Sequence, residues 1–196
     1  MRIISGFLKG KKIDFLKSAT TRPLRDFVKE NIFNIIKHSN LINVKLENAS
    51  ILDLYSGVGS FGIECISRGA KKTTFVENNS TALITLKKNL SSLKIENQSE
   101  VFSAKIVAFF KRLNNKDKFE IIFFDPPFAE NFFIEELKIM KNSAIYKKKH
   151  LIIVHREGKS KDYLEKTMNV LLTRSYGKSK VIFPSPTIGF LYCDIW

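Results

Sequence analysis

Cysteine is scarce in this chain, and long apolar runs are absent from it. Its 196 residues include two cysteines, Cys65 and Cys193, and neither lies in a C-x-x-C pair. This argues against a disulfide framework and against a zinc site, and no metal is expected. No apolar run approaches the roughly eighteen residues that span a bilayer, and the first residues show no apolar stretch of the signal-peptide type. We therefore expect no membrane partner and a reducing, cytoplasmic environment.

Acidic residues are few relative to basic ones. The chain has 33 Lys and Arg against 19 Asp and Glu, which gives a net charge of +14 and a pI near 9.8. An excess of this size favours polyanionic partners, and nucleic acid is the natural candidate. A lysine-rich composition by itself also produces such an excess, so charge alone does not identify the partner.

The first forty residues are more basic than their length requires, with nine Lys or Arg against three Asp or Glu. Gly6 and Gly10 separate two short segments, 2–5 and 11–15, that predict a hairpin. A hydroxyl before a proline and apolar residues at helical spacing predict a helix over 20–36.

We expect one domain over residues 1–196. Residues 1–40 would form a basic extension, a β-hairpin plus a helix, that faces nucleic acid, and residues 41–196 would form a catalytic core. The candidate nucleic-acid contacts are Arg2, Lys9, Lys11, Arg22 and Arg25.

From Ala49 onward, strand-like runs alternate with amphipathic helical stretches. Strands are expected near 50–54, 72–76, 100–103, 119–124 and 150–155, and helices near 60–68, 80–91, 105–113, 131–141 and 160–168. This alternation predicts an α/β fold, a mainly parallel twisted sheet with helices on both faces. The pattern then changes to strands at 169–174, 179–183 and 189–195, joined by turns at 176–177 and 184–186. These predict antiparallel strands at the C-terminal end of the sheet.

A glycine-rich turn follows the first strand of this core. Gly57, Gly59 and Gly62 satisfy G-x-G-x-x-G between a strand and a helix, and Glu77 ends the next strand twenty residues after Gly57. This spacing is typical of sites for adenosine-type cofactors, in which the backbone approaches the ligand and a carboxylate holds the ribose. It does not by itself separate dinucleotides from other adenosine ligands.

Asp53 separates these ligand classes. A carboxylate just before the glycine turn repels a pyrophosphate, whereas S-adenosylmethionine carries an ammonium and a sulfonium and no phosphate. The sequence therefore favours S-adenosylmethionine over a dinucleotide. A simpler interpretation, that Asp53 and Glu77 only cap turns, does not explain why the position, the glycines and the acid spacing agree.

A second segment, Asp125-Pro126-Pro127-Phe128, directly follows a buried strand. Consecutive prolines continue neither strand nor helix, so the chain leaves the sheet as a rigid turn. Asp125 and the Pro126 carbonyl supply acceptors, and Phe128 supplies a ring, at the edge where open α/β sheets bind ligands. These groups suit a nucleobase, stacked on the ring with its amine held by the acceptors.

The histidines give no comparable signal. His38, His150 and His155 are scattered without metal-ligand spacing, so surface or core roles are expected for them.

The glycine turn and the Asp-Pro-Pro-Phe segment together resemble class I S-adenosylmethionine-dependent methyltransferases that modify exocyclic amines. The N-terminus resembles the RsmD family of 16S ribosomal RNA guanine-N2 methyltransferases in Met1 to Gly6, Gly10 to Lys12, Arg22-Pro23, Asp26, Val28, Glu30 and Phe33. The resemblance implies a Rossmann-like fold, S-adenosylmethionine as cofactor with S-adenosylhomocysteine as product, and 16S rRNA of the small ribosomal subunit as partner.

The resemblance also assigns residues to roles. It places the target guanine at Asp125, Pro126, Pro127 and Phe128. It places the cofactor at Asp53, Tyr55, Ser56, Gly57, Gly59, Glu77, Asn78 and Ser103. Ser103 departs from the family pattern, since many relatives have Asp or Asn there to meet the adenine amine.

Three other functions remain open at this point. An adenine-N6 methyltransferase acting on DNA or RNA would use the same Asp-Pro-Pro-Phe segment, although the N-terminus resembles the guanine enzymes. A nicotinamide-dependent oxidoreductase is disfavoured by Asp53. A non-catalytic RNA-binding module is disfavoured by the intact acidic and glycine residues.

Overall fold

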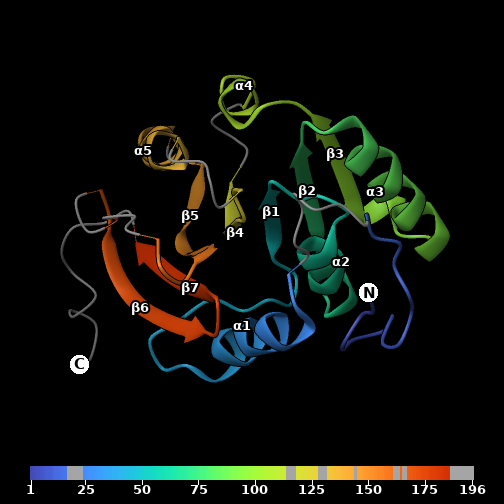
Figure 1. Cartoon of the computed structure of the whole chain (residues 1–196), viewed down its shortest axis with the longest axis horizontal. Helices are drawn as coiled ribbons and strands as arrows, with labels where there is room; N and C mark the ends of the chain where they lie inside the picture. The colour runs from blue at the N-terminus through green and yellow to red at the C-terminus, as the bar shows by residue number, and fades with distance from the viewer. Residues whose placement is uncertain are drawn as a thin grey trace.

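A seven-stranded sheet runs through the centre of the molecule in the computed structural model (Figure 1). The structure describes residues 1–16, 24–113, 118–127, 132–143, 145–160, 164 and 167–185. The strands are β1 (Ser50–Leu54), β2 (Lys72–Glu77), β3 (Ser99–Ser103), β4 (Phe119–Phe124), β5 (Tyr146–Glu157), β6 (Asn169–Tyr176) and β7 (Ser179–Ser185). The helices are α1 (Asp26–His38), α2 (Ser60–Ser67), α3 (Ser80–Leu93), α4 (Ile106–Phe110) and α5 (Phe133–Ser143), with a 3-10 turn at Glu96–Gln98.

The strand order is β3-β2-β1-β4-β5-β7-β6. The first five strands are parallel, and β7 pairs antiparallel with both β5 and β6. This confirms the predicted α/β fold with its antiparallel C-terminal end. The strand order reverses between β1 and β4, and an open sheet binds ligands at the carboxyl ends of its strands beside such a reversal.

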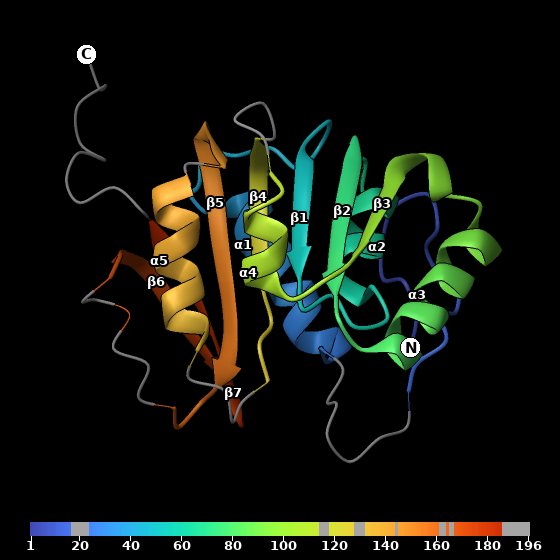
Figure 2. The same ribbon diagram turned by 90° about the horizontal axis from the view of Figure 1, so that it is seen from above.

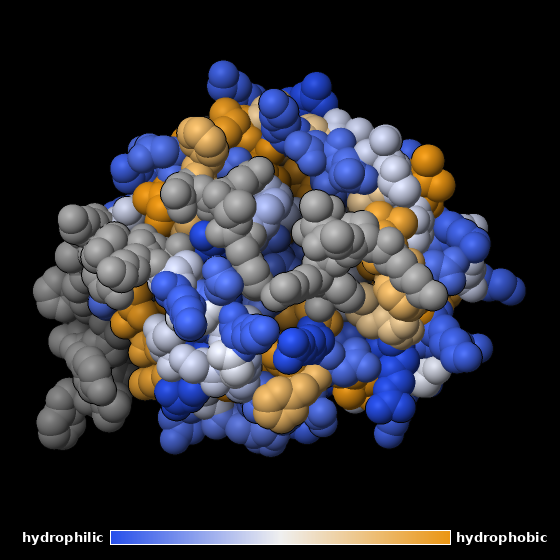
Figure 3. All heavy atoms as spheres, viewed as in Figure 1, coloured by the Kyte–Doolittle hydropathy of each residue, from blue (hydrophilic) through white to orange (hydrophobic). Residues whose placement is uncertain are grey.

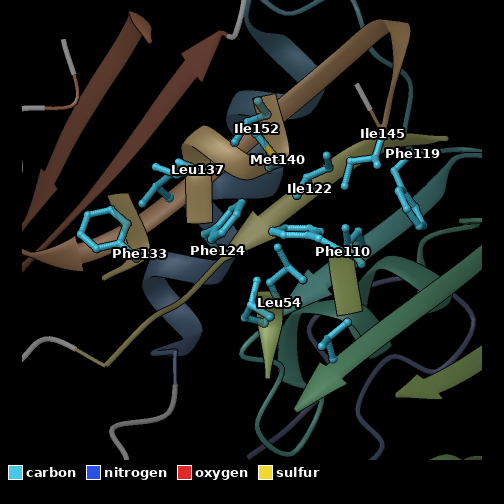
Figure 4. Close-up of a cluster of buried hydrophobic side chains, with 14 of the residues drawn as sticks. Leu54, Phe110, Phe119, Ile122, Phe124, Phe133, Leu137, Met140, Ile145 and Ile152 are labelled. Carbon is cyan, nitrogen blue, oxygen red and sulfur yellow. The ribbon is translucent and has the colours of Figure 1, made fainter. Parts of the chain in front are cut away.

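Helices cover both faces of the sheet, α4 and α5 on one side and α1 and α2 on the other (Figures 1 and 2). Alternation along each strand decides which residues meet which helices. Ile122, Phe124 and Ile152 pack with Leu137 and Met140 of α5 (Figure 4). The intervening residues of the same strands face α1 through a second apolar cluster. Within the described residues, no helix is both long and apolar enough to cross a membrane.

The N-terminal arm, residues 1–16, is less regular than predicted. Its two segments lie antiparallel, and the Ile3 N–H donates to the Lys11 carbonyl (3.0 Å). They form a single bridge, Arg2 with Lys12, instead of two strands. The arm instead folds against α2, where the Leu8 N–H donates to Ser67 Oγ (3.0 Å). Side-chain acceptors of α2 therefore replace part of the expected strand pairing.

Several boundaries differ from the sequence prediction. Helix α1 spans Asp26–His38, whereas a helix over 20–36 was predicted; the extended backbone of Arg25 (ψ 141°) keeps the helix from beginning before Asp26. Strand β5 begins at Tyr146, earlier than expected, and α4 ends at Phe110, earlier than expected. Pro184 belongs to β7 and pairs with Val170, although a turn was predicted there. The pairing of β7 with β5 ends at Ile182, before Pro184, and the pairing of β7 with β6 shifts register next to it. Pro184 has no N–H, and at this place no hydrogen bond between strands is lost for that reason. The predicted strand 189–195 and most of the predicted helix 160–168 lie outside the described residues.

A buried charge cluster joins the arm to α1 and α2, and the sequence did not reveal it. Glu64 of α2 and Lys29 of α1 are both fully buried, with 3.5 Å between Nζ and Oε2. The Ile4 and Ser5 N–H groups donate to the two Glu64 oxygens (2.8 and 2.9 Å), and Arg68 Nε donates to Oε1 (2.8 Å). Burial lowers the pKa of Lys29, and the nearby carboxylates of Glu64 and Asp26 partly offset this.

Glu64→Ala is expected to destabilise the protein strongly. It leaves the Lys29 ammonium buried without its main counter-ion and two arm N–H groups without their acceptor, a change that costs about 3–5 kcal/mol. Urea unfolding of the purified protein measures this loss. Glu100→Ala is the matched control, because its ion pair with Lys72 is exposed and worth under about 1 kcal/mol. Equal losses in the two variants would contradict the importance of the cluster.

Candidate active site

Three carboxylates gather at the carboxyl edge of the sheet. Asp53 lies near the end of β1, Glu77 ends β2, and Asp125 directly follows β4. The three strands are neighbours, and Leu54 pairs with both Val76 and Phe124, so their ends lie side by side. A cluster of negative charge on a protein of net charge +14 marks this edge as suited to a cationic ligand.

The glycine turn closes over this edge through backbone bonds. The Ser56 N–H donates to the Val76 carbonyl (3.1 Å), and the Gly59 N–H donates to the Ser56 carbonyl (2.8 Å). Gly57 has a left-handed backbone (φ 55°), and nothing lies within 4 Å of the position a Cβ would take there. A Cβ on Gly62 would lie 2.3 Å from the Phe75 ring, so this glycine lets α2 approach β2 closely. The turn therefore leaves open space at Gly57, where a ligand is predicted.

Glu77 holds the turn in place. One carboxylate oxygen accepts from the Gly57 N–H (2.7 Å), and the other accepts from the Asn78 and Asn79 N–H groups (2.9 and 2.8 Å). A carboxylate has further acceptor positions, so its predicted bonds to ribose hydroxyls remain compatible with these contacts. Ser103 pairs with Glu77 across β3 and β2, and both Ser103 and Asn78 are exposed beside it.

Asp53 is almost fully buried, with 1% of its surface exposed. Its Oδ2 accepts from the Gly62 N–H (2.9 Å) in the first turn of α2. Burial raises the pKa of Asp53 well above its ordinary value, and the charges of Asp125 and Glu77 raise it further. A cationic group bound here would favour the ionised form and offset this repulsion.

Tyr55 and Ser56 complete the turn. Tyr55 has a left-handed backbone (φ 58°), which is uncommon for a residue with a side chain and is found at functional turns. Its hydroxyl donates to Glu136 of α5. Ser56 is buried, and its Oγ has no partner among the described residues. An acceptor or donor of a bound cofactor would satisfy this hydroxyl, so the turn fits the predicted ligand.

The Asp125 turn is held by two side chains of β5. His155 Nδ1 lies 2.8 Å from Asp125 Oδ1. Arg156 donates to the Pro127 carbonyl (3.0 Å) and, at 3.5 Å, to the Pro126 carbonyl, while its guanidinium stacks 4.2 Å from the Phe133 ring centre. The carbonyl predicted to hold an amine therefore already has a donor, although a carbonyl accepts two.

His155 is buried, as the predicted surface or core roles allow, but its contact with Asp125 was not predicted. Phe124 pairs with Val154, so the next residues of β4 and β5, Asp125 and His155, are neighbours at the same edge. The strand pairing would have revealed this contact, whereas the search for metal-ligand spacing could not. Among the described residues, no group of three or more His, Cys, Asp or Glu is placed to hold a metal. Phe128 lies outside the described residues.

The basic residues predicted to contact RNA lie in two places. Arg2 is exposed and faces Asp26 (3.8 Å), next to the exposed Arg25 at the start of α1. Lys9 and Lys11 are exposed on the turn that docks near Ser67, at the far end of α2 from the glycine turn. Hydrophilic side chains cover much of the face seen in Figure 3. Arg22 lies outside the described residues.

Comparison with solved structures defines the class of protein. A proposed methyltransferase from Escherichia coli has a TM-score of 0.78 at 25% identity, covering 94% of this chain and 96% of that one. A proposed methyltransferase complexed with S-adenosylhomocysteine has the same fold (TM-score 0.62, 16% identity), over 80% of this chain and 48% of the other. Together with the glycine turn and its acidic residues, this defines a Rossmann-like, S-adenosylmethionine-dependent methyltransferase.

Sequence comparison identifies the family. Residues 1–184 match the family described as conserved hypothetical protein 95. The chain is 36% identical over 158 residues to ribosomal RNA small subunit methyltransferase D of Haemophilus influenzae, covering 80% of this chain and 79% of that protein. The protein of the same name from Escherichia coli is 29% identical over 157 residues, covering 80% and 75%. The chain belongs to this family, the RsmD family, as its sequence predicted.

Binding of S-adenosylmethionine is expected to release a proton from Asp53. A raised pKa means that the free folded protein holds this proton more tightly than the unfolded chain does, so stability falls as pH rises through it. A bound ammonium favours the ionised form, so affinity should increase with pH over the same range. Calorimetry in buffers of different ionisation enthalpy counts the protons released.

Asp53→Asn should release fewer protons than the wild type, because it has no acid to ionise. Asp14→Asn is the control, because Asp14 is exposed on the N-terminal arm and should leave the count unchanged. An identical proton count for wild type and Asp53→Asn would show that the ligand's positive charge does not act on Asp53.

Proposed function

We propose that this protein transfers a methyl group from S-adenosylmethionine to the exocyclic N2 amine of a guanine in 16S rRNA of the small ribosomal subunit, in the cytoplasm. The observation that carries the proposal is the placement of Asp125, on a rigid diproline turn, beside the glycine turn and its two carboxylates. The names of the relatives, which are rRNA small subunit methyltransferases, support the RNA substrate. The net charge of +14 supports it independently.

The chemistry of the amine explains these residues. An exocyclic amine donates its lone pair to the base ring and is a poor nucleophile until acceptors hold its hydrogens. The bound cofactor supplies a methyl group on a sulfonium. Asp125 and the Pro126 carbonyl would hold the amine hydrogens, and its lone pair would then face the methyl carbon. As the N–C bond forms and the C–S bond breaks, the amine loses one proton, which Asp125 can accept or pass to water.

Asp125 and the Pro126 carbonyl would hold the amine hydrogens of guanine or of adenine equally well, because a carboxylate and a carbonyl only accept hydrogen bonds and both amines carry two hydrogens. The resemblance of the N-terminus to the guanine-N2 enzymes is what favours guanine. Phe128 would stack on the base, an interaction worth roughly 1–3 kcal/mol.

The proposal is tested by methyl transfer from labelled S-adenosylmethionine to unmodified small ribosomal subunits or their isolated RNA, followed by nucleoside analysis. N2-methylguanosine is the expected product. N6-methyladenosine would identify the enzyme as an adenine methyltransferase, and cofactor binding without transfer to either RNA would refute the proposed substrate.

The exposed basic residues of the arm and α1 are expected to bind the RNA backbone. Changing Lys9, Lys11 and Arg25 to Ala should weaken RNA binding and reduce the slope of log affinity against log salt by about two to three. Filter binding over a range of salt concentrations measures both quantities.

The matched control removes three exposed lysines outside this region, Lys45, Lys87 and Lys111. It lowers the net charge equally. If both triple variants change the salt slope by the same amount, the effect is one of overall charge, and the arm is not the binding surface.

A further inference from the structure

His155 and Asp125 occupy equivalent positions on neighbouring strands. Each follows by one residue a paired position, Val154 in β5 and Phe124 in β4. Both side chains point to the face of the sheet that also carries Phe123 and Ile153, and the Nδ1 to Oδ1 distance is 2.8 Å. The register of β4 and β5 thus brings the ring to the carboxylate of the first residue after β4.

The side chain of His155 is more deeply buried than that of Asp125. The His155 side chain is 7% exposed, whereas that of Asp125 is 23% exposed. The histidine lies behind the carboxylate, on the protein side, and the carboxylate faces outward. Because a carboxylate only accepts, the ring must donate Nδ1–H to Oδ1, and Oδ2 keeps its acceptor positions for another ligand.

Resting on the function proposed above, we propose that His155 is a positioning residue that fixes the Asp125 carboxylate and thereby sets the rate of methyl transfer. A free aspartate rotates about two side-chain bonds, and ordering it during the reaction slows turnover. The hydrogen bond from His155 fixes that rotation before the base arrives.

Arg156 contributes a parallel restraint on the backbone of the same turn. It points to the opposite face of the sheet, where its guanidinium stacks on Phe133 and donates to the Pro127 carbonyl. With the backbone held by Arg156 and the side chain by His155, the position of the carboxylate is set from both faces of the sheet.

Three substitutions of His155 test the position of the donor. Asn places an N–H near the position of Nδ1, Gln places one near the position of Nε2, and Leu has the size of Asn without a donor. We expect His155→Asn to retain most of the turnover and His155→Gln and His155→Leu to lose roughly tenfold to a hundredfold. The Michaelis constant for RNA and the affinity for S-adenosylmethionine should change by less than about twofold, because neither ligand is bound through His155.

His150→Leu is the control on the same strand, since His150 Nδ1 contacts the Lys147 carbonyl at the opposite end of β5. It should leave the rate unchanged.

A double-mutant cycle with Asp125→Ala separates positioning from a general structural effect. Asp125→Ala alone should slow turnover by roughly a hundredfold. If His155 acts through Asp125, adding His155→Gln to that variant should change the rate by less than about twofold.

Fully additive losses, or equal losses in the Asn and Gln variants, would overturn the inference. If the wild type methylates guanine and none of the His155 variants slows it, the inference fails while the proposed function stands. If the wild type methylates no RNA, the proposed function itself has failed.

Discussion

The buried carboxylate of Glu64 is the constraint that holds the N-terminal arm against the rest of the protein. Residues 1–16 have a single bridge between their two segments, so they cannot hold their shape by strand pairing alone. A fully buried charge must be compensated, and here two arm N–H groups, Arg68 and Lys29 together compensate it. The arm, α1 and α2 thus share one set of interactions. Because α2 begins directly after the glycine turn, the conformation of the arm is linked to that turn through a single short helix.

The electrostatic character of the molecule differs between its surface and its site. The chain carries a net charge of +14, yet Asp53, Glu77 and Asp125 meet at the carboxyl edge of the sheet. The positive surface favours the RNA backbone, and the acidic edge favours a cofactor that carries positive charge. The acidic edge also repels phosphate, so a base entering the site is favoured over the backbone that carries it.

The sequence predicted the features that depend on local pattern. Short apolar runs that alternate with amphipathic helical segments located the parallel strands, and glycine spacing located the turn beside Asp53. The sequence did not predict the contacts that depend on strand register or on burial by distant segments of the chain. His155 is an ordinary strand residue until β5 pairs with β4, and Lys29 looks like a surface lysine of an amphipathic helix until the arm covers it. The length of the arm strands was overestimated because their acceptors lie on α2, 59 or 60 residues away in the chain.

The end of β5 limits where residues can be inserted or deleted in this chain. His155 and Arg156 are adjacent in sequence but serve opposite faces of the sheet, one facing Asp125 and the other facing Phe133. Antiparallel pairing with β7, His155 opposite Val181 and Arg156 opposite Lys180, sets which residue faces which side. Inserting or deleting one residue in β5 would exchange the two faces and remove both restraints together. Insertions and deletions should therefore be tolerated poorly in β5 and better in the connections between the strands.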